Sequence, residues 1–240
     1  MAQFKTYEAR LVRSVPLSEF TKHLELEVER VDHFGFVPGQ WLSVKAKTPD
    51  GEEMTRAYSI ASPPSENGHV AFCLNRVHEG FMSNHLCSLN QGDEITFQGP
   101  FGSFILHPPM RDAVFIATGT GIAPFRSMLH WLLAEEDRHE GRQLWLLFGA
   151  RCERDIYYRE EFERLAVEHS NFHFLPTLSR APAEWNGLRG YVQTHLTEIV
   201  GARTDMHAYI CGLANMVKAN RELLKSLGWD RTSIRYERYD

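Results

Sequence analysis

Clustered cysteines are missing from this 240-residue sequence. The four cysteines that it has are widely scattered, with no Cys-x-x-Cys pair, at Cys73, Cys87, Cys152 and Cys211. This spacing argues against a structural zinc site or an iron–sulfur cluster held by the chain, so we expect no bound metal. We expect the thiols to be reduced, as in a cytoplasmic protein.

An excess of positive charge and a long apolar run are also missing. The chain has 26 basic and 31 acidic residues and a net charge of -5, which argues against nucleic acid as a partner. The longest apolar runs, at 113–117 and 144–150, are far too short to span a bilayer, and the first residues lack the apolar core of a signal peptide. We therefore expect no contact with membranes. We also expect a cytoplasmic monomer.

Short strands dominate the first half of the sequence. Alternating apolar and polar residues between turn signals predict strands at 5–15, 21–28, 40–47, 56–62, 70–77 and 95–98. Only one helix is expected there, at about 80–89. Short strands at turn-rich spacing are typical of a small antiparallel β-barrel, which we place in residues 1–108.

The pattern changes near the prolines at 108 and 109. Apolar strands at 113–118, 144–149, 172–178, 207–211 and 233–237 alternate with helical segments at 123–136, 158–169, 192–200 and 215–227. Alternation of this kind indicates an α/β domain with a doubly wound parallel sheet of five strands, which we assign to residues 109–240.

The strand at 56–62 carries an unusual set of side chains and must end at the following Pro63. Arg56 offers a planar fork of donors for phosphate oxygens, and Tyr58 offers a flat face for an aromatic ring. Together with Ser59 they suit a ligand that has both a phosphate and an aromatic system. An ordinary strand with one exposed arginine explains the same residues.

A glycine-rich turn follows the first strand of the second domain, in the sequence Thr118-Gly119-Thr120-Gly121-Ile122-Ala123-Pro124. Glycines let backbone N–H groups approach a diphosphate, and the next helix directs its positive end at it. The third glycine of the Gly-x-Gly-x-x-Gly fingerprint is absent, so a simple tight turn is the alternative.

The order of these motifs resembles the ferredoxin–NADP reductase family over essentially the whole chain. The resemblance implies an FAD-binding barrel, a NAD(P)-binding domain and hydride transfer from nicotinamide to flavin. In it Arg56 pairs with the flavin diphosphate, Tyr58 stacks on the isoalloxazine and Ser59 hydrogen-bonds near N5. The implied flavin contacts are Arg56, Ala57, Tyr58, Ser59, Cys73, Leu74, Asn75, Val77, Gly80, Phe81, Met82, Ser83 and Thr120. For Ser83 a helix cap is the structural alternative.

The resemblance also assigns residues to the nicotinamide nucleotide. Gly119 and Thr120 face its diphosphate, and Gly212 lies near the nucleotide. Met216, in the helix that follows, either lies near the nucleotide or belongs to the core. Members that use NADPH carry a Ser-Arg pair, a basic residue and a tyrosine at the spacing found here, in Ser179, Arg180, Arg189 and Tyr191. A solvated loop with ordinary surface charges is the alternative.

Three residues are expected to form the catalytic shell: Ser59, Cys211 and Glu237. In the family this cysteine lies beside the nicotinamide ring, and a Glu-x-aromatic tail places an acid near it and an aromatic ring over the flavin. Tyr239 matches that aromatic residue, but the chain continues to Asp240, where the family's closest versions end or add another aromatic. A small buried hydrophobe at Cys211 and a frayed tail are the alternatives.

The predicted function is transfer of a hydride from NADPH to FAD and then of single electrons to ferredoxin, flavodoxin or another small redox protein. An NADH-dependent reductase of an oxygenase system and a non-catalytic, flavin-binding electron-channelling subunit are the alternatives. A free-flavin reductase is a further alternative, against which the segment 80–83 argues.

Overall fold

The computed structural model describes residues 5–239, so Asp240, where the sequence departs from the family's usual ending, lies outside the described residues. The chain forms two compact units. One contains the residues through Ile105 together with Ala123–Trp131, and the other contains Leu106–Ile122 and the residues from Leu132 onward. No helix within the described range is long and apolar enough to cross a bilayer.

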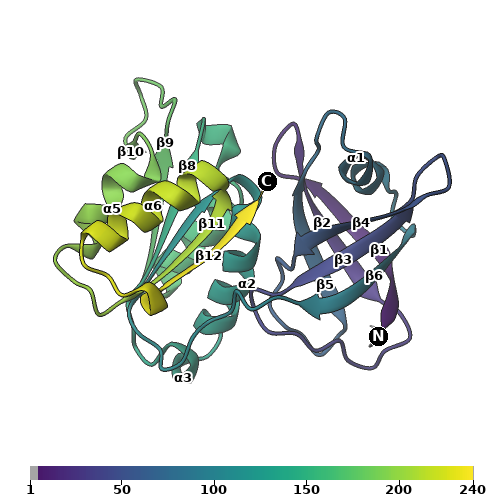
Figure 1. Cartoon of the computed structure of the whole chain (residues 1–240), viewed down its shortest axis with the longest axis horizontal. Helices are drawn as coiled ribbons and strands as arrows, with labels where there is room; N and C mark the ends of the chain where they lie inside the picture. The colour runs from purple at the N-terminus through teal and green to yellow at the C-terminus, as the bar shows by residue number, and fades with distance from the viewer. Residues whose placement is uncertain (1–4, 240) are drawn as a thin grey trace. The chain divides into compact units, whose positions relative to one another are not determined.

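The first unit contains an antiparallel sheet of six strands, coloured purple to teal in Figure 1. Its spatial order is β4-β3-β6-β1-β2-β5, and a bridge between Ile60 and Phe72 joins the two edges. This confirms the predicted barrel. The elements are β1 (Thr6–Pro16), β2 (Thr21–Val28), β3 (Trp41–Lys47), β4 (Glu53–Ser59), β5 (His69–Asn75), α1 (Phe81–Ser88) and β6 (Glu94–Phe101).

The barrel interior is filled by alternate side chains of the strands. Leu24 and Leu26 of β2 and Leu42 and Val44 of β3 have no exposed surface, and Phe97 of β6 packs among them. Full burial of one such side chain contributes about 1.5–3 kcal/mol. The same alternation leaves every second residue outside, which is how β4 can present polar side chains.

The second unit contains a parallel sheet in the order β10-β9-β8-β7-β11-β12. The strands are β7 (Ala113–Thr118), β8 (Leu144–Ala150), β9 (Phe172–Leu178), β10 (Leu188–Arg189), β11 (His207–Leu213) and β12 (Ile234–Tyr239). The doubly wound fold is confirmed, but the prediction of five strands was wrong by one. β10 has only two residues, too few to produce a recognisable alternation.

Helices connect these strands: α2 (Ile122–Leu133), α3 (Glu136–His139), α4 (Arg159–Glu168), α5 (Val192–Val200) and α6 (Ala214–Ser226). α5 and α6 cover one face of the sheet (Figure 1) and pack on apolar side chains of β7, β8 and β11. β7 has β8 on one side and β11 on the other. The chain therefore changes winding direction between β7 and β11, and ligands bind beyond the carboxyl ends of the strands at such a point.

Candidate cofactor sites

Three side chains near the end of β4 become progressively more buried along the chain. Arg56 is exposed, Tyr58 is half-buried and Ser59 is 7% exposed. The Tyr58 ring packs against the buried Phe72 ring, with centroids 5.6 Å apart and an interplanar angle of 37°. Burial raises the pKa of Tyr58 to about 12; Cys87 adds to the shift and Arg56 opposes it. The phenol therefore stays neutral at physiological pH.

The Arg56 guanidinium has no acidic partner in the described part of the chain. Its Nη1 donates to the Thr55 carbonyl at 2.8 Å, and it makes no ion pair among residues 5–239. An unpaired guanidinium on an exposed strand can bind an anion without first breaking an internal ion pair.

The loop before α1 is locked by two side chains of that helix. The Val77 N–H donates to Ser83 Oγ at 3.0 Å, and Ser83 Oγ donates to the Gly80 carbonyl at 3.1 Å. Asn84 Nδ2 donates to the carbonyls of Val77 and Gly80 at 2.8 and 2.9 Å. Sequence reasoning missed Asn84. Gly80, not Ser83, is the N-cap residue, so the structural alternative of a cap at Ser83 was wrong.

The start of α1 offers backbone donors next to β4. The first intrahelical bond of α1 is from Asn84 N to the Gly80 carbonyl, at 3.1 Å, so the N–H groups of Phe81, Met82 and Ser83 have no partner within the helix. The first turn contains no acidic residue, and α1 packs against β4. Arg56 and these N–H groups therefore form a donor set that fits the diphosphate of a dinucleotide.

Some of the predicted flavin contacts have side chains that point elsewhere. Leu74 and Met82 are each 2% exposed in the barrel core, and Cys73 is 5% exposed, so any contribution from the first two to a ligand must come from their backbone. The Asn75 side chain is exposed and accepts from Thr21 Oγ1 at 3.0 Å. Val77 is also exposed.

In the second unit, the glycine-rich turn lies against the end of β11. A Cβ on Gly121 would lie 2.3 Å from the Cys211 carbonyl oxygen. A Cβ on Gly212 would lie 2.6 Å from Thr118 Oγ1 and 3.0 Å from Met216 Cε, and Gly212 has φ +139. The carboxyl ends of β7 and β11 thus approach as closely as backbone allows. Thr118 Oγ1 is buried there without a hydrogen-bond partner among the described residues, and sequence reasoning did not single it out.

The C-terminal strand brings predicted residues together at the same edge. In the register of β11 and β12, Cys211 pairs with Glu237 and Leu213 pairs with Tyr239. Cys211 has no exposed surface. Burial raises the pKa of the Cys211 thiol well above its usual value, Glu237 adds to the shift, and a hydrogen bond with Tyr239 opposes it. The thiol is therefore neutral and does not serve as a thiolate.

The segment after β9 holds the residues predicted to select the nucleotide. The Arg180 N–H donates to the Arg151 carbonyl at 2.9 Å, and the Ser179 N–H donates to the Ala150 carbonyl at 3.0 Å. Arg151 and Arg180 are both exposed, and neither makes an ion pair within residues 5–239. Arg151 was not predicted, because its closeness to Arg180 arises only from the pairing of β8 with β9. Tyr191 is 65% exposed.

Arg189 is engaged differently. Its guanidinium donates to the carbonyls of Ala181, Ala183 and Trp185 at 3.5, 3.0 and 2.5 Å. It thereby holds the loop between β9 and β10 in shape.

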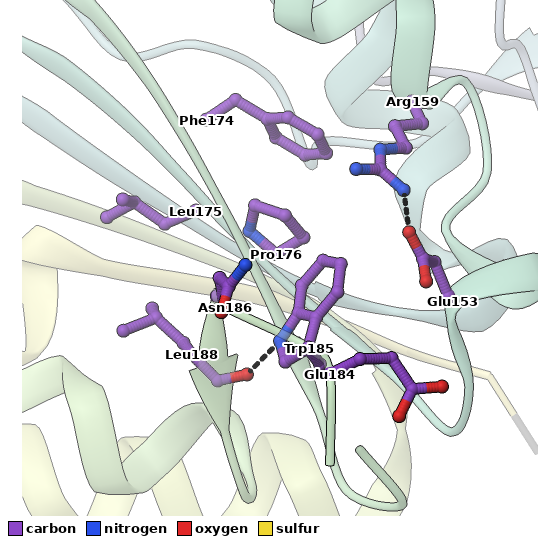
Figure 2. Close-up of a pocket in the computed structure, with 10 residues that line it drawn as sticks. Glu153, Arg159, Phe174, Leu175, Pro176, Glu184, Trp185, Asn186 and Leu188 are labelled. Carbon is purple, nitrogen blue, oxygen red and sulfur yellow. Dashed lines mark hydrogen bonds and ion pairs between the residues drawn. The ribbon is translucent and has the colours of Figure 1, made fainter. Parts of the chain in front are cut away.

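A pocket of about 420 Å³ lies under this loop (Figure 2). Trp185 forms one wall, and its Nε1 donates to the Leu188 carbonyl at 2.9 Å. Arg159, which pairs with Glu153, lies across from the indole, 5.5 Å from the ring centroid. These contacts brace the same loop that Arg189 holds from within.

Comparisons with known proteins define the class. The family model "Oxidoreductase FAD-binding domain" matches residues 8–105, and "Oxidoreductase NAD-binding domain" matches residues 115–222. The chain is thus an oxidoreductase that uses FAD and a nicotinamide dinucleotide.

A ferredoxin–NADP reductase B from Sorangium cellulosum is 41% identical over 248 residues, with 100% of both chains covered. The chain belongs to the ferredoxin–NADP reductase family. The toluate 1,2-dioxygenase electron transfer component of Pseudomonas putida is 29% identical, over 97% of this chain and 67% of that protein. The crystal structure of an Amycolatopsis cytochrome P450 reductase has the same fold, with a TM-score of 0.86, 24% identity, and coverage of 99% of this chain and 71% of that one.

Proposed function

We propose that this enzyme oxidises NADPH and delivers electrons to a small redox protein such as ferredoxin or flavodoxin. The observation that carries the choice of NADPH is the pair of unpaired guanidinium groups at Arg151 and Arg180. The two residues are joined through their backbones at the carboxyl ends of β8 and β9. A 2′-phosphate dianion matches two adjacent cations, whereas the ribose hydroxyl of NADH gains little from them.

We assign a role in binding or hydride transfer to the predicted residues of β4, α1, β11 and β12. When bound, FAD accepts a hydride and can release electrons one at a time. Arg56 and the amino end of α1 hold the diphosphate, and Tyr58 offers its ring face. We assign Ser59 to a hydrogen bond near the flavin N5, and Cys211 and Glu237 to the nicotinamide ring. The buried Cys211 thiol is neutral, so it places no negative charge beside that ring.

Steady-state kinetics with both nucleotides test the NADPH assignment. Arg180→Ala and Arg151→Ala are each expected to raise the KM for NADPH about tenfold or more, because a hydrogen bond to a charged group is worth about 1.5–3 kcal/mol. The KM for NADH should stay within about twofold of wild type. Equal effects on both nucleotides would contradict the assignment.

Arg189 provides the matched comparison for this experiment. It belongs to the predicted phosphate set, yet its guanidinium holds three carbonyls of the loop. If its role is to shape the loop, Arg189→Ala raises the KM for both nucleotides. A rise for NADPH alone would restore it as a direct phosphate ligand.

Stopped-flow reduction of the bound flavin tests the catalytic shell. The double variant Ser59→Ala with Glu237→Ala is expected to retain FAD, because Arg56 and the start of α1 are intact, but to accept hydride much more slowly. Unchanged hydride transfer would remove both residues from the catalytic shell.

The alternative acceptor is an oxygenase system, with NADH as the electron source. The likeness to the toluate 1,2-dioxygenase electron transfer component favours this candidate. Anaerobic assays with NADPH or NADH, each with ferredoxin, flavodoxin or an oxygenase-type carrier, separate the two. Preference for NADPH with ferredoxin or flavodoxin supports the first function, and preference for NADH with the oxygenase carrier supports the second.

A further inference from the structure

A second group of basic side chains lies where the strands of the parallel sheet begin. His207 begins β11 and is the register partner of Ala113, which begins β7. Thr118, at the other end of β7, is five residues further, or about 16 Å at the usual rise of a strand. This group is therefore separate from the glycine-rich turn and from the residues assigned to the nucleotide.

Two buried nitrogen atoms at this edge have no hydrogen-bond partner among residues 5–239. They are His207 Nδ1, in a side chain that is 6% exposed, and Arg235 Nε, near the start of β12. A buried donor without a partner costs about 1–3 kcal/mol, so such atoms are rare unless a water or an ion satisfies them. An arginine Nε can only donate, so its missing partner is an acceptor.

Further basic side chains surround these atoms. The His107 ring lies 6.2 Å from the His207 ring, and the His107 N–H donates to the Tyr209 hydroxyl at 2.9 Å, which fixes that segment beside β11. Arg235 is the register partner of Tyr209 on the neighbouring strand, and the His207 N–H donates to the carbonyl of Asp112, the residue after Arg111, at 2.9 Å. Burial, together with the charges of Arg111, His107 and Arg235, lowers the pKa of His207 to about 4.

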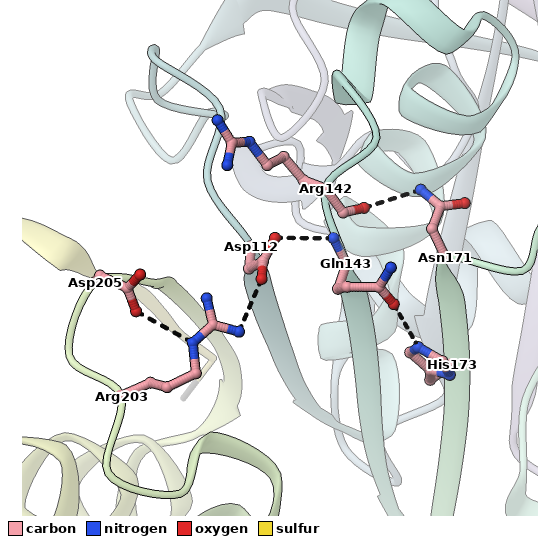
Figure 3. Close-up of polar contacts among 7 residues, drawn as sticks. All are labelled: Asp112, Arg142, Gln143, Asn171, His173, Arg203 and Asp205. Atoms are coloured by element: carbon pink, nitrogen blue, oxygen red, sulfur yellow. Dashed lines mark hydrogen bonds and ion pairs between the residues drawn. The ribbon is translucent and has the colours of Figure 1, made fainter.

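The nearby carboxylates are already engaged (Figure 3). Arg203 Nη1 pairs with Asp112 Oδ2 at 2.8 Å, and Arg203 Nε pairs with Asp205 Oδ1 at 3.2 Å. The other oxygen of Asp112 accepts from the Gln143 N–H at 3.0 Å. Asp205 is close enough to Arg111 to offset part of its charge. Even so, neither Arg111 nor Arg235 makes an ion pair in the described part of the chain.

We propose that Arg235, His207 and Arg111 form a binding site for a small oxyanion, with phosphate as the best match. Donors on two strands and on the segment before β7 converge there, and the oxygens of phosphate can accept from several directions at once. Bound phosphate would give the Arg235 Nε the acceptor that it lacks. Exposed Arg111 and His107 form the outer side, through which an ion can enter.

Calorimetric titration with inorganic phosphate tests the proposal, with chloride at equal ionic strength as the reference. The protein is loaded with FAD and saturated with NADP+, so that the phosphate sites assigned to the two nucleotides are already filled. One saturable site is expected. Arg235→Gln, and Arg111→Gln at the exposed side of the site, should each weaken binding about tenfold or more. Arg164→Gln, which removes the same charge from an exposed position on α4, should leave it unchanged. Arg180→Ala should also leave phosphate binding unchanged, because Arg180 lies at the carboxyl ends of the strands and the proposed site lies at their amino ends.

Repeating the titration with adenosine monophosphate shows whether the site takes only free phosphate or also a phosphate that belongs to a larger molecule. Binding of phosphate alone indicates a free ion, and binding of both indicates that the phosphate can belong to a larger molecule. NMR titration of His207 gives an independent readout. Its midpoint in chloride is expected at about 4 and should rise when phosphate saturates the site. An unchanged midpoint, or binding that Arg180→Ala abolishes, would overturn the proposal.

Discussion

The glycine at position 121 offers the sharpest test of how the turn after β7 meets the end of β11. We predict that Gly121→Ala disrupts this junction. The new Cβ would lie 2.3 Å from the carbonyl oxygen of Cys211, 2.6 Å from its carbonyl carbon and 2.8 Å from Gly212 Cα. All three are backbone atoms, so no change of rotamer can relieve the overlap. Gly121 does not have a positive φ, so the penalty is steric and not conformational.

The geometry sets the size of the effect. Real Cβ contacts essentially never fall below 3.0 Å, so the turn and the strand end must separate by about 0.7 Å. β7 and β11 are hydrogen-bonded neighbours up to the pair Ala117 and Cys211, so the displacement strains a buried ladder. Overpacking of a well-packed site costs about 1–3 kcal/mol. We expect a loss at the upper end, about 3 kcal/mol in the free energy of unfolding of the second unit.

Gly119→Ala is the matched control, two residues away in the same turn. Its Cβ would meet nothing within 4 Å, but its φ of +56 is unfavourable for alanine. Only the conformational cost remains, about 1–2 kcal/mol. Urea unfolding measures both losses, and kcat/KM for the nicotinamide nucleotide measures the effect on function. Gly121→Ala should lose at least about tenfold more kcat/KM than the control while retaining FAD. A Gly121→Ala enzyme as stable and active as the control would refute this account of the junction.

Three further predictions concern single side chains. Arg56→Gln should weaken FAD binding about tenfold or more, measured by flavin release on dilution, whereas Arg30→Gln on the same unit should leave it unchanged. Cys211 should resist alkylation at pH 8 in the folded protein, because burial keeps its thiol protonated, while the partly exposed Cys152 reacts; rapid labelling of Cys211 would contradict its burial. His207 binds a proton more readily when the chain is unfolded, so stability should fall as pH drops from about 6.5 towards 4, by at most about 3 kcal/mol. His207→Gln should flatten this dependence in phosphate-free buffer, and an unchanged pH profile would count against the depressed pKa.

Local patterns were sufficient where a residue's role depends on its neighbours in sequence. Alternation along β2 and β3 placed their apolar residues in the barrel, because side chains of a strand alternate between faces. Helical spacing in α2 and α6, between apolar strands, indicated the parallel sheet. The order of Arg56-x-Tyr58-Ser59, the glycine-rich turn and Cys211 was enough to identify the family.

Other features depend on residues that are distant in the sequence, and only the tertiary structure decided them. The pairing of β11 with β12 places Glu237 beside Cys211, and the pairing of β8 with β9 brings Arg151 to Arg180. Arg189 was expected to bind the nucleotide phosphate or to be an ordinary surface charge, but Nη1 and Nη2 of its guanidinium donate to loop carbonyls.

The two glycines of the turn, Gly119 and Gly121, show the same difference between local and long-range requirements. The positive φ of Gly119 is a local requirement of a tight turn, and the glycine-rich sequence of the turn predicts it. The need for glycine at position 121 comes from the backbone of a strand that lies 90 residues later in the chain. Sequence by itself therefore determined the longer strands and helices and the family, because these follow from local periodicity and motif order. The fold decided which side chains are buried, paired or free to bind, because burial and pairing depend on contacts between distant segments.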